Sequence, residues 1–162
     1  MLTISLATAA DVPAIHGLIR DLAEYERLAH EAVATEADLR NALFAANPRV
    51  FCDLARWQGE VAGMALWFYS YSTFRGRHGI YLEDLFVRPS LRGKSIGQAL
   101  LGQLAERCVS QGLARLEWSV LNWNEPAIGF YRSLGATPMD EWTVWRLTDA
   151  GLQKAGSQQA PT

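Results

Sequence analysis

The stretch YLEDLFVRPSLRGKSIG, from Tyr81 to Gly97, contains both a pattern that predicts the fold and a group of charged residues that indicates a functional site. It begins as an apolar, strand-like run that carries two adjacent carboxylates, Glu83 and Asp84, in its middle. The run stops at Pro89, because proline cannot donate a hydrogen bond to a strand ladder. A short glycine-rich segment with two basic residues follows. The pattern predicts a strand over 80–87, then a loop, then the N-terminus of a helix.

The segment after the strand, RGKSIGQ, has the properties of an anion-binding loop. The first N–H groups of a helix have no partner within the helix, and the helix dipole adds partial positive charge. A P-loop is excluded, because the position six residues before Lys94 is Arg88 and not glycine. The residues alone leave two readings open: a loop that binds a diphosphate, or a capped turn with two solvated cations.

Hydrophobic periodicity and turn residues predict the other elements. Thr-x-x-Asp pairs at Thr8 and Thr35 have the spacing of capping boxes and mark two helix starts. The expected strands are 2–6, 50–57, 60–71, 80–87, 114–120 and 142–147, and the expected helices are 8–26, 35–45, 93–112 and 125–136. This order predicts an α/β fold with a mixed, mostly antiparallel sheet, helices on both faces, and one right-handed parallel crossover. We expect a single domain over 1–150 and a frayed tail over 151–162.

Composition limits the partners of this domain. The net charge of −2 gives no reason to expect nucleic acid or an anionic membrane as a ligand. No apolar stretch is long enough to span a bilayer. The two cysteines, Cys52 and Cys108, belong to no metal-ligand spacing, so we expect no metal site, two reduced thiols and a cytoplasmic location.

Several motifs carry a resemblance to a known family. The run VRPSLRGKSIGQALL resembles the coenzyme A pyrophosphate loop of the GNAT acetyltransferases, R/Q-x-x-G-x-G/A, with Ser95 where the family usually has its first glycine. WNEPAIGFYRSLGA resembles the family's asparagine loop and the helix after it. LAEYE, TEADL, YLEDLFV and WRL match the spermidine/spermine and thialysine acetyltransferase branch in order, from about Thr3 to Leu147. The resemblance implies the GNAT acyl-CoA acyltransferase fold, acetyl-CoA as co-substrate, and a homodimer.

The resemblance also implies which residues contact the coenzyme. In the family, a bulge on the strand before the loop frees N–H groups for the acetyl carbonyl and the pantetheine arm, and the loop itself binds the pyrophosphate. The positions that match are Leu85, Phe86 and Val87 on the strand, Arg92, Gly93, Lys94, Ser95, Ile96, Gly97 and Gln98 in the loop, and Asn124, Pro126 and Ala127 in the asparagine loop.

Amine acetylation needs a base and an acid. An alkylammonium has a pKa of about 10.4, so the free base costs about 4.6 kcal/mol to reach at pH 7, and the departing thiolate benefits from a donated proton. The resemblance implies Glu83 as the base, acting through ordered water, and Tyr131 as the acid. A salt bridge for Glu83 and core packing for Tyr131 stay open as alternatives. In a regular strand Glu83 and Asp84 face opposite sides, unless a bulge re-aims them.

The resemblance further implies an anionic amine pocket. Its residues would be Tyr25, Glu26, Glu83, Asp84 and Glu117. Glu117 replaces a histidine of the polyamine enzymes, and Thr143 replaces an acidic residue, so the amine itself stays undetermined. We expect an N-acetyltransferase that moves acetyl to a primary amine of a small cationic substrate, by direct attack in a ternary complex. A protein lysine or N-terminal acetyltransferase and a non-catalytic acyl-CoA-binding protein are the alternatives.

Overall fold

The computed structural model describes residues 1–158. The chain divides into two compact units, Met1–Leu121 and Asn122–Thr162, and each is described by itself. The single domain expected over 1–150 stays a prediction.

The first unit contains one five-stranded sheet with the strands in sequence order. The strands are β1 (Leu2–Leu6), β2 (Phe51–Trp57), β3 (Glu60–Ser72), β4 (Arg77–Val87) and β5 (Leu116–Trp118). The first four are antiparallel to their neighbours, and β5 is parallel to β4. The mixed sheet and the parallel connection between β4 and β5 are therefore confirmed. β4 begins three residues earlier than predicted, because its pairing with β3 continues to Arg77 opposite Ser72.

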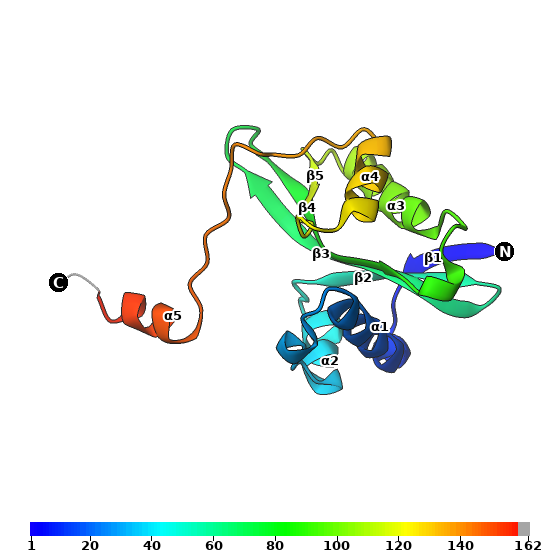
Figure 1. The fold of residues 1–162 in the computed structure, drawn as a ribbon, viewed down its shortest axis with the longest axis horizontal. Coiled ribbons are helices and arrows are strands. Elements are labelled where there is room, and N and C mark those ends of the chain that lie inside the picture. The colour runs from blue at the N-terminus through cyan, green and yellow to red at the C-terminus, as the bar shows by residue number, and fades with distance from the viewer. Residues whose placement is uncertain (159–162) are drawn as a thin grey trace. The chain divides into compact units, whose positions relative to one another are not determined.

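Three helices cover this sheet, with α1 (Val12–Tyr25) and α2 (Glu36–Phe44) on one face and α3 (Ile96–Ser110) on the other (Figure 1). Short 3-10 turns precede or connect them at Ala9–Asp11, Ala29–Glu31 and Pro89–Leu91. Both predicted capping boxes are present. In the second, the Thr35 hydroxyl accepts a hydrogen bond from the Asp38 amide at 3.1 Å, and the Asp38 carboxylate accepts one from the Thr35 amide at 2.8 Å.

Two apolar layers hold the helices to the sheet. The layer beneath α1 and α2 consists of buried residues from five elements: Val12, Ile15, Leu18, Leu39, Leu43, Cys52, Leu54, Met64 and Phe86. On α3, the buried positions are Ile96, Leu100, Leu101, Leu104 and Cys108. Both cysteines are free thiols.

One buried charge lies beside α3. Asp53, which is 1% exposed, forms a two-pronged ion pair with Arg107 at 2.9 and 3.0 Å and accepts a hydrogen bond from the Trp67 indole at 2.7 Å. The Arg107 guanidinium lies over the Trp67 ring, 4.8 Å from its centroid. The Asp53 carboxylate thus accepts hydrogen bonds from both Arg107 and Trp67, and these contacts join α3 to β2 and β3.

The second unit contains α4 (Glu125–Ser133) and α5 (Asp149–Gly156). The strand predicted over 142–147 is wrong: these residues form no strand in the described part of the chain. Their alternating apolar pattern suits a strand, but a strand also needs a partner that accepts its hydrogen bonds. The predicted tail falls partly on α5, and its last residues, 159–162, lie outside the described residues.

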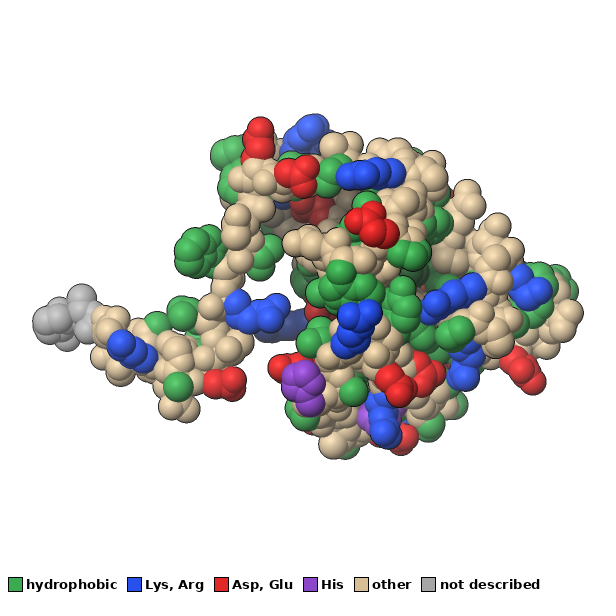
Figure 2. Space-filling view, viewed as in Figure 1, with side chains coloured by type: hydrophobic (Ala, Val, Ile, Leu, Met, Phe, Trp, Pro, Cys, Tyr) green, Lys and Arg blue, Asp and Glu red, His purple; other side chains and the backbone are tan. Residues whose placement is uncertain are grey.

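Charge is mixed on the face that Figure 2 shows. Figure 2 shows basic and acidic side chains interspersed on the visible face, without a broad field of one sign. No helix among the described residues combines the length and apolarity that crossing a membrane requires.

Candidate active site

A bulge in β4 sets the geometry of the two carboxylates. Asp84 lies opposite Leu66 of β3. Leu82 lies opposite the next residue of β3, Trp67. Glu83, between them, has no partner and is the extra residue of the bulge. The bulge expected on this strand therefore lies at Glu83.

The bulge decides which face Asp84 occupies. Neighbouring residues of β3 point to opposite faces, so Asp84 and Leu82 do too, although a regular strand would place both on one face. Phe86, two residues beyond Asp84, belongs to the layer beneath α1 and α2. Asp84 consequently lies on the α1 face of the sheet.

Asp84 is the centre of a group of three carboxylates. Burial raises the pKa of Asp84 to about 6, and the charges of Glu83 and Glu26 add to this rise. Burial also raises the pKa of Glu26, at the C-terminal end of α1. Glu83 forms no ion pair with the residues that the structure describes. The structure thus brings together three of the four predicted substrate-binding carboxylates, and their uncompensated charge suits a cationic ligand.

Glu117 differs from these three. It lies on β5 and forms an ion pair with Arg115 at 2.8 Å. Its charge does not contribute to the raised pKa of Asp84. A neighbouring guanidinium already compensates this carboxylate, which leaves it less available to a cationic ligand than the other three.

The C-terminal part of β4 has an open edge. The pairing of β5 with β4 ends at Trp118 opposite Leu82, so residues 83–87 have no neighbour on that side within the first unit. Alternate residues of an edge direct N–H and C=O groups outward. Leu85 and Val87, predicted to contact the coenzyme, lie on this stretch.

The loop after β4 leads into a helix start without a cap. No side chain caps the N-terminus of α3, so the first N–H groups of this helix stay available to an anion. Gly93 and Ser95 adopt left-handed conformations, with φ of 78° and 61°, and delay the helix start to Ile96 instead of the predicted Gly93. These features fit a diphosphate group.

The two cations of this loop lie over aromatic rings. The Nε of Arg92 donates to the Val87 carbonyl at 3.1 Å, and its guanidinium lies over the Tyr25 ring at 5.0 Å and the Phe86 ring at 5.5 Å. The Lys94 ammonium lies over the Trp57 ring at 5.3 Å. Arg92 therefore joins the loop to Tyr25, a predicted substrate residue on α1.

The remaining predicted residues lie in the second unit. Asn124 is buried and caps α4, with its side-chain oxygen accepting a hydrogen bond from the Ala127 amide at 3.4 Å. Pro126 occupies the first turn of that helix. The Tyr131 ring lies near Phe130, with centroids 5.5 Å apart. Local structure thus gives Asn124 a capping role that its motif did not reveal.

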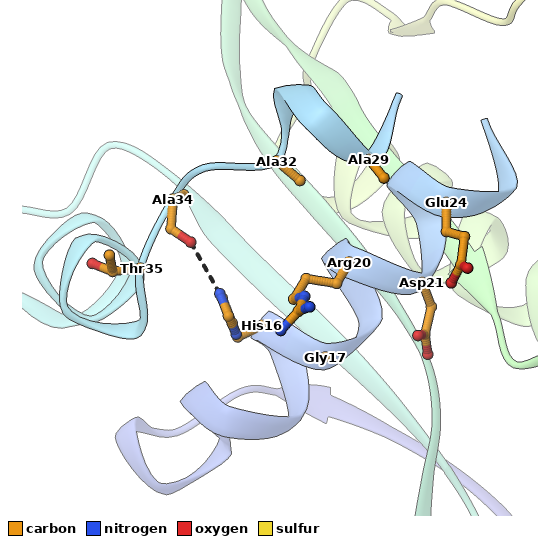
Figure 3. Close-up of a pocket in the computed structure, with 9 residues that line it drawn as sticks. All are labelled: His16, Gly17, Arg20, Asp21, Glu24, Ala29, Ala32, Ala34 and Thr35. Atoms are coloured by element: carbon orange, nitrogen blue, oxygen red, sulfur yellow. Dashed lines mark hydrogen bonds between the residues drawn. The ribbon is translucent and has the colours of Figure 1, made fainter. Parts of the chain in front are cut away.

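A separate hollow of about 700 Å³ lies between α1 and the segment that leads to α2 (Figure 3). His16 crosses it and makes a 2.9 Å hydrogen bond with the Ala34 carbonyl. Arg20, Asp21 and Glu24 also line it. None of the predicted site residues lines this hollow.

Comparisons with known proteins identify the family. Residues 15–136 match the acetyltransferase (GNAT) family. The chain is 34% identical to an L-ornithine N5-acetyltransferase of Arabidopsis thaliana, over 93% of this chain and 86% of the relative. It is 37% identical to a thialysine Nε-acetyltransferase of Bos taurus, over 86% of each. Among solved structures, an integron cassette protein from the mobile metagenome of V. cholerae has a TM-score of 0.81 and 28% identity, over 97% of this chain and 98% of that one.

The chain belongs to the GNAT family and is an N-acetyltransferase. The predicted fold class and family are confirmed.

Proposed function

We propose that this enzyme transfers the acetyl group of acetyl-CoA to a primary amine of a small cationic substrate, such as a polyamine, a diamine or a cationic amino acid. Two observations carry this proposal: the cluster of three carboxylates, Glu26, Glu83 and Asp84, and the uncapped start of α3 on the chain that follows β4. The carboxylates attract a cation, and the N–H groups at the start of α3 attract a diphosphate.

Coenzyme A would lie along the open edge of β4. In this proposal the outward N–H groups of Leu85 and Val87 bind the acetyl carbonyl and the pantetheine arm, and the amides at 93–98 bind the pyrophosphate. The Asn124 segment contributes further contacts to the arm through Pro126 and Ala127. Among the described residues, no group of three or more His, Cys, Asp or Glu side chains is arranged so that it could hold a metal ion.

The acetyl transfer is a direct attack in a ternary complex. Glu83, acting through water, takes the proton of the substrate ammonium, and the free amine attacks the thioester carbon. The C–N bond forms, the tetrahedral intermediate collapses, and the C–S bond breaks. Tyr131 protonates the departing thiolate, and the attacking nitrogen gives its second proton to the resulting tyrosinate, which regenerates Tyr131. The accessible, unpaired Glu83 favours this role over a structural salt bridge.

The substrate class rests on charge and on the relatives. The names of two relatives above give ornithine and thialysine as their substrates. Each of these compounds has a second polar end beyond the amine that is acetylated. Glu26 and Asp84 would attract the ammonium group that is to be acetylated. A protein lysine or N-terminal acetyltransferase would instead need an open groove for a peptide. A non-catalytic acyl-CoA-binding protein would have no need of three uncompensated carboxylates.

A thiol-release assay with acetyl-CoA tests these alternatives. The amines would be spermidine, ornithine, a lysine analogue, an amino-sugar antibiotic and a lysine-containing peptide. We expect release with the small cationic amines. Release with the peptide alone would favour protein acetylation. Binding of acetyl-CoA in calorimetry without release for any amine would favour the non-catalytic alternative.

A pair of variants on α1 sharpens this test. Glu26→Gln should raise the KM for the small amine several-fold and leave the KM for acetyl-CoA unchanged. Glu24→Gln removes a carboxylate from the same helix, on the side that lines the hollow of Figure 3. This control should leave both constants unchanged. Equal changes in both constants for Glu26→Gln would contradict the anionic pocket.

We also propose a homodimer. Met139, Trp142, Val144, Trp145 and Leu147 are mostly exposed in the described chain. Exposed apolar side chains in such a run are typical of a protein interface. A second copy of the chain is the partner that we infer.

A further inference from the structure

We propose that the rings of Phe68 and Tyr81 form the part of the acceptor site that binds the substrate's second ammonium, the one that is not acetylated. This inference rests on the proposed function, since it concerns the same amine. Tyr81 begins the YLEDLFV motif, but neither ring is among the residues predicted to bind the substrate.

The two rings are cross-strand neighbours on the face of the sheet that carries Asp84. Phe68 of β3 lies opposite Tyr81 of β4, and their centroids are 5.2 Å apart with planes tilted by 31°. Phe68 follows Leu66 by two residues, so both point to one face. Leu66 lies opposite Asp84. The ring pair therefore continues the face that carries Asp84.

The rings are half-buried and lie outside the core. Neither Phe68 nor Tyr81 belongs to the buried layer beneath α1 and α2 or to the partly buried side chains packed against it. By contrast, Trp67 on the opposite face of β3 is 2% exposed and bonded to Asp53. Core packing thus accounts for Trp67 but not for the ring pair.

A hydrogen bond fixes the position of Tyr81. Its hydroxyl lies 2.8 Å from the hydroxyl of Ser119, just beyond the end of β5. The bond bridges the point where β5 stops pairing with β4. It restrains the ring at its polar end.

The spacing suits a doubly charged substrate. Tyr81 precedes Asp84 by three residues, which corresponds to roughly 7–10 Å along a bulged strand. The amine that attacks must be neutral at that moment, whereas the other ammonium keeps its charge. An aromatic face binds an alkylammonium through its quadrupole and covers its alkyl stem. Carboxylates at one end and rings at the other would thus hold the two ends of a diamine.

Substitutions that keep or remove the ring test this inference. The substrates are cadaverine and n-hexylamine, in which a methyl group replaces one ammonium. Tyr81→Leu should lower the ratio of kcat/KM for cadaverine to that for n-hexylamine by about 2- to 30-fold. Tyr81→Phe keeps the ring, loses the Ser119 bond, and should keep most of this ratio. The KM for acetyl-CoA should stay constant in both variants.

Phe68→Leu is a second variant, used if Tyr81→Leu does not fold by circular dichroism. It should lower the same ratio. An unchanged ratio in the folded leucine variants would overturn the inference, as would an equal loss for both amines. These outcomes leave the proposed function intact. If the wild-type protein acetylates none of cadaverine, ornithine and spermidine, the proposed function fails, and the inference fails with it.

Discussion

Ser95 holds a backbone conformation that disfavours its own side chain. Its φ of 61° lies in the left-handed region, which costs an L-residue about 1–2 kcal/mol. We expect Ser95→Gly to raise the free energy of unfolding by about 0.5–1 kcal/mol, since glycine removes this strain but gains freedom in the unfolded chain. Removal of the Cβ should also tighten acetyl-CoA binding. Urea unfolding and calorimetry measure the two effects.

Ala105→Gly is the control for Ser95→Gly. Ala105 is exposed within α3, where glycine should cost about 1 kcal/mol. If both glycine variants lower the free energy of unfolding, the left-handed conformation of Ser95 does not destabilise the folded protein.

Tyr131→Phe removes only the hydroxyl that we propose as the acid. We expect kcat to fall by about 10²–10⁴-fold without unfolding of the protein, because the ring that lies near Phe130 is kept. Tyr71→Phe removes a hydroxyl from an exposed tyrosine and should leave kcat unchanged. Undiminished turnover of Tyr131→Phe under conditions where chemistry limits the rate would exclude the acid role.

The protonation of Asp84 should be visible in amine binding. Its pKa of about 6 is raised by burial, by Glu83 and by Glu26. A protonated Asp84 attracts an ammonium less, so the KM for the amine should rise as pH falls through about 6. The stability contribution has the opposite direction: it is fully present below the unfolded-state pKa and is lost as pH rises through about 6. Asp84→Asn should remove the inflection near pH 6 from both profiles, and an inflection that persists would assign it to another group.

At the level of single residues, the sequence could identify the carboxylates but not their faces. The motif YLEDLFV contains Glu83 and Asp84, yet alternation alone placed Asp84 beside Leu82. Only the register against β3 shows where the bulge lies and that it places Asp84 and Leu82 on opposite faces of the sheet. Arg92 is similar: its motif indicated an anion, whereas its contact with Tyr25 depends on how the loop meets α1.

At the level of elements, the ion pair of Asp53 and Arg107 attaches α3 to the sheet. Asp53→Asn should lower the free energy of unfolding by about 3–5 kcal/mol, because it leaves the Arg107 guanidinium, only 14% exposed in its side chain, without its charge partner. The double variant Asp53→Leu with Arg107→Met removes both charges and should recover much of this loss. Urea unfolding of the two variants and of the wild-type protein checks this. Equal losses for the single and double variants would show that packing, not charge, dominates at this position.

Sequence patterns predicted the elements well wherever a local signal existed. The capping boxes at Thr8 and Thr35 and the turn between β2 and β3 are local, and these elements end within a few residues of the predicted bounds. Asp53 was missed, because its partners are 14 and 54 residues away in sequence. The strand prediction for 142–147 was wrong for the opposite reason. Its own pattern is strand-like, but a strand forms only beside a neighbouring strand.

At the level of the whole molecule, the exposed segment 142–147 and the outer edge of β5 each lack a strand partner within their own unit, as far as the chain is described. An unpaired edge and an unpaired strand-like sequence are complementary, and exchange of such a segment between copies is one route to a homodimer. Val144→Asp places a charge in this segment, at a side chain that is 80% exposed. We expect it to shift the mass measured by light scattering from dimer to monomer. Val109→Asp, at an 81% exposed position on α3, is the matched control and should keep the dimer. A monomeric wild-type protein, or dissociation by both variants alike, would exclude this segment as the interface.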